Sequence, residues 1–110
     1  MTAPEYGDVV WLDFDPQVGH EQAKRRPALV LSPQSFNEEF RLAFVCPVST
    51  KPKGNAFEVL FPAGHSVKGA VLVHQLKSFD WHERRAVRIC SAPPEVVAEA
   101  ADIVRDILRV

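Results

Sequence analysis

Hydrophobic and polar residues alternate most clearly near the start of the chain. In residues 8–15, DVVWLDFD, the side chains of Val10, Leu12 and Phe14 share one face. A period of two with branched and aromatic side chains predicts a strand with one buried face. Trp11 falls on the opposite face, where we expect it to be exposed.

Further short apolar runs follow, and turn signals such as Gly54-Asn55 and Lys68-Gly69 separate them. We expect strands in residues 28–32, 41–48, 56–61, 70–73 and 86–90. Pro47 cannot donate a hydrogen bond to a strand ladder, so it predicts the end of its strand or an edge. Many short strands at close spacing predict a small twisted barrel or an open sheet.

The last part of the chain has a helical pattern instead. From Pro94 onward, apolar residues recur at helical spacing, at Val97, Ala100, Ala101, Val104 and Leu108. Proline suits a first helical position, so we expect an amphipathic helix that begins at Pro94 and packs on the sheet. The predicted architecture is mainly β with one long terminal helix, in a single domain over residues 1–110.

Composition and charge narrow the function. The chain is 46% hydrophobic and 25% charged, which is typical of a globular domain and not of a disordered one. A formal net charge of −1 argues against a protein that coats nucleic acid through bulk positive charge. The net charge does not argue against a local cationic groove, because the cations are bunched at Lys24 to Arg26, at Lys51 and Lys53, at Lys77, and at Arg84, Arg85 and Arg88.

The sequence gives no sign of a metal or cofactor. Cys46 and Cys90 lie far apart in apolar runs, where small buried thiols are expected. The four histidines, His20, His65, His74 and His82, lack a metal-ligand spacing. There is no phosphate-binding glycine loop, no secretory signal and no run long enough to span a bilayer, so we expect a cytoplasmic protein without a membrane partner.

One long loop is a candidate for chemistry. Residues 15–26 form a predicted loop that ends in Lys24, Arg25 and Arg26, directly before Pro27. Loops of this length are often functional. The proline stiffens the chain around Arg26, and a planar guanidinium that is held still suits phosphate oxygens. A solvated basic loop is the alternative interpretation.

Two further segments carry polar side chains where strands end. Ser49 and Thr50 precede Lys51 and Lys53, and hydroxyl and ammonium groups on one loop can bind phosphate. Residues 74–78, HQLKS, directly follow the apolar run at 70–73. Each segment alone also fits an ordinary turn or a polar edge.

Taken together, these segments resemble the MazF/PemK (Kid) family of toxin endoribonucleases. The stretch GDVVWLDFDPQVGHEQAKRRPALVLSP is similar to the opening of that family, and PVSTKPKGNAFEV, HQLKS and the terminal helix follow in the same order. The resemblance implies an SH3-like barrel that dimerises. It also implies metal-independent cleavage of single-stranded RNA by the 2′-hydroxyl, and inhibition by a cognate MazE-like antitoxin.

The resemblance also implies roles for single residues. Arg26 takes the place of the catalytic arginine, and Ser49 or Thr50 supplies the catalytic hydroxyl. Glu21 is a candidate general base, with His20 as the alternative. We expect RNA contacts from Trp11, His20, Lys24, Arg25, Lys51, Lys53, His74, Gln75 and Lys77. For Trp11, a contact with a dimer partner or the antitoxin is an equal alternative to stacking on RNA.

Two other functions are compatible with a small barrel of this kind. One is a gyrase poison similar to CcdB on the same fold. The other is a non-catalytic SH3-like binding module, in which the Arg26-Pro27 and Ser49-Thr50 segments are structural. The arginine and the hydroxyl loop together favour the nuclease.

Overall fold

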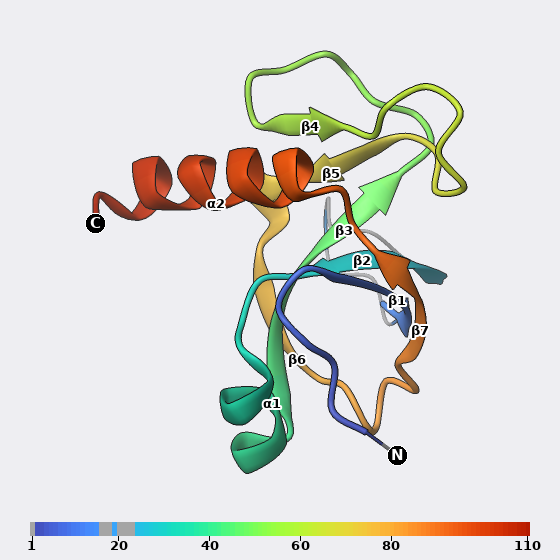
Figure 1. Ribbon diagram of the computed structural model, residues 1–110, viewed down its shortest axis with the longest axis vertical. Helices are drawn as coiled ribbons and strands as arrows, with labels where there is room; N and C mark the ends of the chain where they lie inside the picture. The colour runs from blue at the N-terminus through green and yellow to red at the C-terminus, as the bar shows by residue number, and fades with distance from the viewer. Residues whose placement is uncertain (1, 16–18, 20–23) are drawn as a thin grey trace.

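In the computed structural model, which describes residues 2–15, 19 and 24–110, strands dominate and a long helix crosses one side (Figure 1). The elements in chain order are β1 (Asp8–Asp13), β2 (Arg25–Val30), α1 (Gln34–Phe40), β3 (Leu42–Ser49), β4 (Glu58–Leu60), β5 (Ala70–Leu72), the 3-10 turn η1 (Val73–Gln75), β6 (Lys77–Asp80), β7 (Val87–Ser91) and α2 (Pro94–Leu108). The expected mainly β architecture with a C-terminal helix is confirmed.

The strands form one antiparallel sheet in the order β4-β5-β3-β2-β1-β7. The sixth strand, β6, pairs with the first half of β3. Strand β3 therefore has β2 along one edge, and β6 followed by β5 along the other. Figure 1 shows β3 running through the middle of the molecule between these partners.

Two sequence-based boundaries were wrong. Strand β2 begins at Arg25, so Arg25 and Arg26 lie in the sheet and not in the preceding loop. Pro47 lies inside the central strand β3 and not at an edge. The ladder tolerates Pro47 because the pairing with β6 ends at Val45 and the pairing with β5 begins at Val48, so no partner on that edge needs its missing N–H.

The sheet separates two hydrophobic cores. Val10 and Leu12 of β1 face one core, which also contains Phe79 and Trp81. Val9 faces the other core, which lies under α2. The first strand is thus buried on both faces at its start, and the exposed surface begins only at Trp11, which keeps 42% of its area accessible. The prediction of one buried face held only for the far half of the strand.

Helix α1 (Gln34–Phe40) was not predicted from the sequence. In the structure Asn37 is fully buried within α1. Its amide nitrogen donates to the carbonyl oxygens of Pro4 and Ser32, and its amide oxygen accepts from the Ser32 hydroxyl at 2.6 Å. Trp81 Nε1 donates to the Asn37 carbonyl at 2.8 Å. A buried polar residue with all of these partners ties the helix to the N-terminal segment.

Helix α2 begins at Pro94, as predicted, and covers the core that contains Val9. Val96 and Ala100 are its buried residues, and Val97 and Val104 pack beside them. Leu108, which was expected on the packed face, is 58% exposed. Within the described part of the chain, no helix has the length and apolar character needed to cross a membrane.

Candidate active site

A pocket of about 530 Å³ opens where the start of β2 meets the end of β3. A pocket of this size has room for a small part of a polynucleotide. Its walls also include η1 and the loop that follows β3. The lining residues are Arg26, Ser49, Thr50, Lys51, Lys53, Asn55, Glu58, Leu72, His74 and Gln75.

The strand register explains why Arg26 meets the hydroxyl-bearing turn. Strands β2 and β3 pair Ala28 with Pro47 in an antiparallel ladder. Continuing that register by two residues along each strand places Arg26 opposite Ser49. Residues opposite each other in an antiparallel pair project from the same face. Both side chains therefore reach one pocket, although they are far apart in the sequence.

The two candidate hydroxyls differ in their surroundings. Ser49 is the last residue of β3 and is only 8% exposed, whereas Thr50 is exposed. The Ser49 hydroxyl oxygen accepts a hydrogen bond from the Lys51 backbone N–H at 3.1 Å. This local bond fixes the turn and leaves the Ser49 hydroxyl hydrogen available to a ligand.

Gly69 packs against the backbone of this turn. Its φ is +102°, and a Cβ atom at this position would lie 2.0 Å from the Ser49 carbonyl oxygen. No side chain fits there, so only glycine lets β5 approach the Ser49-Thr50 backbone this closely. Ser49 pairs with Ala70, the neighbour of Gly69, which fixes the end of β3 against β5.

The loop after β3 is closed around Glu58, a residue that the sequence analysis missed. The backbone N–H groups of Lys53, Gly54 and Asn55 donate to its carboxylate, at distances from 2.6 to 3.2 Å. These bonds, led by the one from Lys53, hold the pKa of Glu58 below its ordinary value of 4.5, and the charge of His74 adds to the effect. The only signal in the sequence was an acid placed shortly after Gly54-Asn55.

Residues 74–78 do not act as one unit. His74 and Gln75 belong to η1 and line the pocket. Lys77 begins β6, outside the lining, and its ammonium lies 5.6 Å from the centre of the Phe79 ring. The pocket thus combines cations, hydroxyls, two side-chain amides and an imidazole, a set suited to a phosphodiester and its neighbouring bases.

Comparisons with known proteins show the family of the chain. The family described as PemK-like, MazF-like toxin of type II toxin-antitoxin system matches residues 5–108. The chain belongs to this family. It is 41% identical over 92 residues to the endoribonuclease toxin MazF of Escherichia coli (strain K12), covering 84% of this chain and 82% of that protein. It is 45% identical over 103 residues to the endoribonuclease toxin ChpB of the same organism, covering 87% and 86%.

Solved structures of MazF have the same fold. MazF from Deinococcus radiodurans superposes with a TM-score of 0.94 at 45% identity, and the match covers 98% of each chain. A MazE-MazF structure from the same organism matches with a TM-score of 0.88 at 45% identity, covering 98% of this chain and 97% of that chain. The resemblance to the MazF/PemK family seen in the sequence is therefore confirmed.

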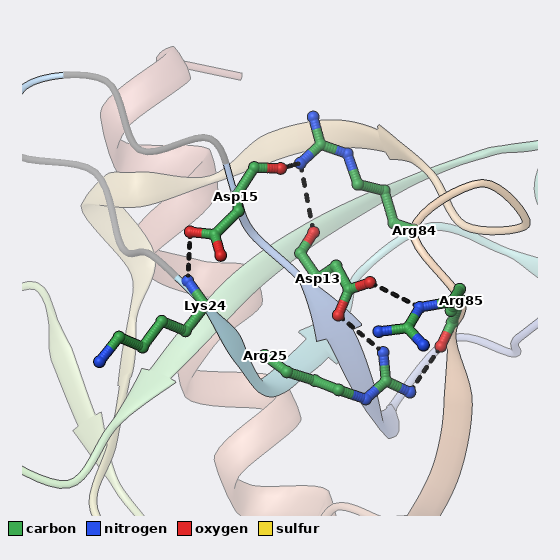
Figure 2. Close-up of polar contacts among 6 residues, drawn as sticks. All are labelled: Asp13, Asp15, Lys24, Arg25, Arg84 and Arg85. Carbon is green, nitrogen blue, oxygen red and sulfur yellow. Dashed lines mark hydrogen bonds and ion pairs between the residues drawn. The ribbon is translucent and has the colours of Figure 1, made fainter.

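A second group of cations in this MazF/PemK chain lies outside the pocket (Figure 2). The Asp13 carboxylate accepts from Arg25 Nη1 at 3.0 Å and from Arg85 Nε at 2.7 Å. Arg25 also donates to the Arg85 carbonyl at 2.7 Å. These hydrogen bonds, first that from Arg85 and then that from Arg25, hold the pKa of Asp13 below its ordinary value of 3.8.

Residues of the same group also join the two ends of the loop between β1 and β2. Arg84 donates to the Asp15 carbonyl at 2.6 Å, and the Asp15 carboxylate accepts from the Lys24 backbone N–H at 2.7 Å. Figure 2 shows the Lys24 side chain pointing away from these contacts. Lys24 and Arg25, both predicted to contact RNA, thus lie at the base of the loop and do not line the pocket.

The remaining predicted residues have different outcomes. Trp11 faces Pro27 and Val87 in the ladder, while Arg26 pairs with Leu12, so Trp11 and Arg26 project from opposite faces of the sheet. Glu21 and His20 lie outside the described residues. Among the residues that are described, no group of three or more His, Cys, Asp or Glu side chains could hold a metal ion.

Proposed function

We propose that this protein is an endoribonuclease toxin that cleaves single-stranded RNA at a short sequence, without a metal ion. The observation that carries the proposal is the pocket with Arg26 on one wall and Ser49 and Thr50 on the facing strand end. The relatives MazF and ChpB of Escherichia coli are endoribonuclease toxins and support the reaction class. We expect products with 2′,3′-cyclic phosphate and 5′-hydroxyl ends.

In the proposed reaction, one bond to the phosphorus atom forms and another breaks. The 2′-hydroxyl loses its proton to a base and its oxygen bonds to the adjacent phosphorus. The bond from phosphorus to the 5′-oxygen then breaks, and that oxygen takes a proton from water. Guanidinium groups stay protonated in proteins, so Arg26 is not the base. Glu21, with His20 as the alternative, is the chemically easier acceptor of the 2′-hydroxyl proton.

The pocket supplies stabilisation of the pentavalent phosphorane. Arg26 presents several donors in one plane and carries a positive charge toward the phosphoryl oxygens. The Ser49 hydroxyl donates a further hydrogen bond from the opposite strand. Lys51 and Lys53 hold the neighbouring phosphates, and His74 and Gln75 contact base edges.

A partner and a dimer belong to the same proposal. A MazE-MazF structure exists for the Deinococcus radiodurans relative. We expect a MazE-like antitoxin to inhibit this chain, and we expect the chain to act as a homodimer. A gyrase poison or a non-catalytic module is the alternative, and no observation at the pocket favours either.

An RNA digest tests the proposal. Purified protein is incubated with mixed-sequence single-stranded RNA in excess chelator, and the fragment ends are analysed and sequenced. Cyclic-phosphate and 5′-hydroxyl ends at one short motif are expected. Intact RNA would refute an endoribonuclease, and activity that appears only after metal is added would refute the metal-independent route. Trapped gyrase-cleaved DNA in a parallel assay would favour the gyrase poison.

Removal of the Arg26 guanidinium gives the first mutational prediction. Arg26→Ala should lower the single-turnover rate at saturating RNA by about 10² to 10³-fold, the usual cost of one transition-state donor. Arg105→Ala is the matched control, because it removes an exposed guanidinium on α2 that is outside the pocket. A rate for Arg26→Ala within a few-fold of the control would end the assignment.

A further inference from the structure

Among the described residues, Glu58 is the one carboxylate that lines the pocket, and its presence there needs a physical explanation. The charged lining residues Arg26, Lys51 and Lys53 all favour an anion, but Glu58 would repel it. A free carboxylate beside an RNA phosphate would cost binding energy through like-charge repulsion. Glu58 is half-buried and its oxygens are already occupied by hydrogen bonds, which points to a structural use of its charge.

The backbone around Glu58 is arranged as a small anion-binding nest. Three successive N–H groups, those of Lys53, Gly54 and Asn55, converge on its oxygens, with the shortest bond, 2.6 Å, from Gly54. Gly54 has a φ of +81°, the left-handed conformation that turns successive N–H groups inward. The anion in this nest is therefore a side chain of the protein itself, the carboxylate of Glu58, which is the first residue of β4.

A second set of bonds closes the same turn. The Asn55 side-chain oxygen accepts from the Phe57 N–H at 2.8 Å, and the Asn55 carbonyl accepts from the Glu58 N–H at 3.3 Å. At its other end the loop is fixed by the bond from the Lys51 N–H to the Ser49 hydroxyl. The backbone that carries Lys51 and Lys53 is therefore held at both ends.

We propose that Glu58 is a positioning residue, which fixes the backbone of residues 51–55 so that Lys51 and Lys53 meet the RNA phosphates at the pocket. The Glu58 carboxylate accepts hydrogen bonds from the loop amides, and these bonds offset its negative charge and so reduce its repulsion of the phosphate. Substitution should loosen the loop and weaken RNA binding, while the chemical step, which depends on Arg26 and Ser49, should change little. The RNA half of this inference rests on the proposed function, and the loop half does not.

Two measurements on Glu58→Gln test the inference. Gln has nearly the same shape as Glu but loses the charge and one acceptor oxygen. In the RNA-free protein, the amides of Lys53, Gly54 and Asn55 should exchange with solvent at least about tenfold faster than in wild type. In cleavage assays, KM should rise about tenfold with kcat within about twofold, the pattern of lost uniform binding.

Glu99→Gln is the matched control, because it removes an exposed carboxylate on α2 outside the pocket. The control should leave both readouts unchanged. Unchanged exchange of the three amides in Glu58→Gln would overturn the anchoring role. Faster exchange with an equal or lower KM would also overturn the inference, since it would mean that the freed nest itself binds phosphate. If wild type cleaves no RNA, the proposed function fails, and the exchange result still decides whether Glu58 anchors the loop.

Discussion

Ser49 and Thr50 were equivalent candidates in the sequence, and the structure separates them. Ser49 is buried at the strand end, opposite Arg26 in the extended register, whereas Thr50 is exposed one residue beyond the strand. A donor that is already oriented loses little entropy when it meets the transition state. We therefore favour Ser49 as the hydroxyl that acts on the phosphate.

The second prediction follows from this difference. Ser49→Ala should lower the single-turnover rate by about 10²-fold, the scale of one lost transition-state donor. Thr50→Val, which keeps the shape of the side chain, should stay within about threefold of wild type. The affinity of each variant for an uncleavable RNA shows whether the loop has moved. A damaging Thr50→Val beside a mild Ser49→Ala would reverse the two roles.

Asp13 gives a pH-dependent prediction at the same scale. Its pKa is lowered in the folded protein by Arg85 and Arg25. A group with a depressed folded pKa stabilises the fold fully above its unfolded value, here 3.8, and loses that contribution as the pH falls through the folded pKa. Arg85 is exposed and Arg25 is partly exposed, so solvent screening keeps this contribution small.

Urea unfolding of wild type and Asp13→Asn tests this third prediction. The difference in the free energy of unfolding between wild type and Asp13→Asn should be constant from about pH 7 to about pH 5. By about pH 3 a large part of this difference should be lost. Asp102→Asn, which breaks an exposed pair with Arg105 on α2, serves as a control. An Asp13→Asn gap that is as large at the lowest pH as at neutral pH would contradict the assigned cause.

At the scale of elements, the contact between β5 and the end of β3 positions the site. Gly69 meets the Ser49 carbonyl so closely that any side chain must push the two strands apart. Gly64 offers a matched comparison, since its φ is +85° but a Cβ atom at that position would have nothing within 4 Å. Alanine would strain the backbone at either position, because both have a positive φ. Only at Gly69 would its Cβ atom also clash with a neighbouring strand.

The fourth prediction concerns this pair of glycines. Gly64→Ala should cost about 1–3 kcal/mol of stability through backbone strain and should leave the cleavage rate of the folded protein unchanged. Gly69→Ala should cost more stability, and should also lower the rate at a temperature where the protein is folded, because Ser49 and Thr50 are displaced. Unfolding in urea and single-turnover cleavage measure the two effects. Equal rates in the two variants would show that the strand contact does not position the hydroxyls.

The sequence predicted the elements that have a simple hydrophobic pattern. The strands expected at 8–15 and 41–48 are found at 8–13 and 42–49, and α2 begins at Pro94 as its proline placement predicted. Helix α1 did not, because its one buried residue is the polar Asn37 and no apolar stripe marks it. Strand β6 was missed for a similar reason, since Phe79 is its one buried side chain.

The candidate site was predictable only as separate segments. Nothing local relates Arg26 to Ser49, because the β2-β3 register that brings them together is set by pairs further along both strands. Glu58 was missed because its role depends on backbone amides of the loop before it. The family resemblance supplied the connection between these segments that the pattern alone lacked.

At the scale of the whole molecule, positive charge is concentrated in a few clusters and does not cover the surface. The net charge is −1. Among the described residues, Arg26, Lys51 and Lys53 line the pocket and Arg25 and Arg85 lie around Asp13, while further cations such as Lys77 and Arg105 lie elsewhere. In that group the guanidinium groups of Arg25 and Arg85 are engaged with the Asp13 carboxylate. RNA bound in the pocket should meet the few cations that line it, namely Arg26, Lys51 and Lys53.

The fifth prediction is a shallow salt dependence of RNA binding. Single-stranded nucleic acid contributes a slope of about −0.7 in log K against log salt for each phosphate contact, so about three contacts give a slope near −2. Titrations of an uncleavable RNA at several salt concentrations measure it. A slope steeper than about −5 would mean that the RNA also runs over the cations around Asp13.

The most direct test of the account is a crystal structure of the protein with an RNA that carries a single 2′-deoxynucleotide at the cleavage position, found from the digest. The substitution removes the nucleophile, so the scissile phosphate should remain intact in place. The account predicts this phosphate in the pocket, within about 3.2 Å of both the Arg26 guanidinium and the Ser49 hydroxyl. A scissile phosphate bound anywhere else, for example over Arg25 and Arg85, would contradict it.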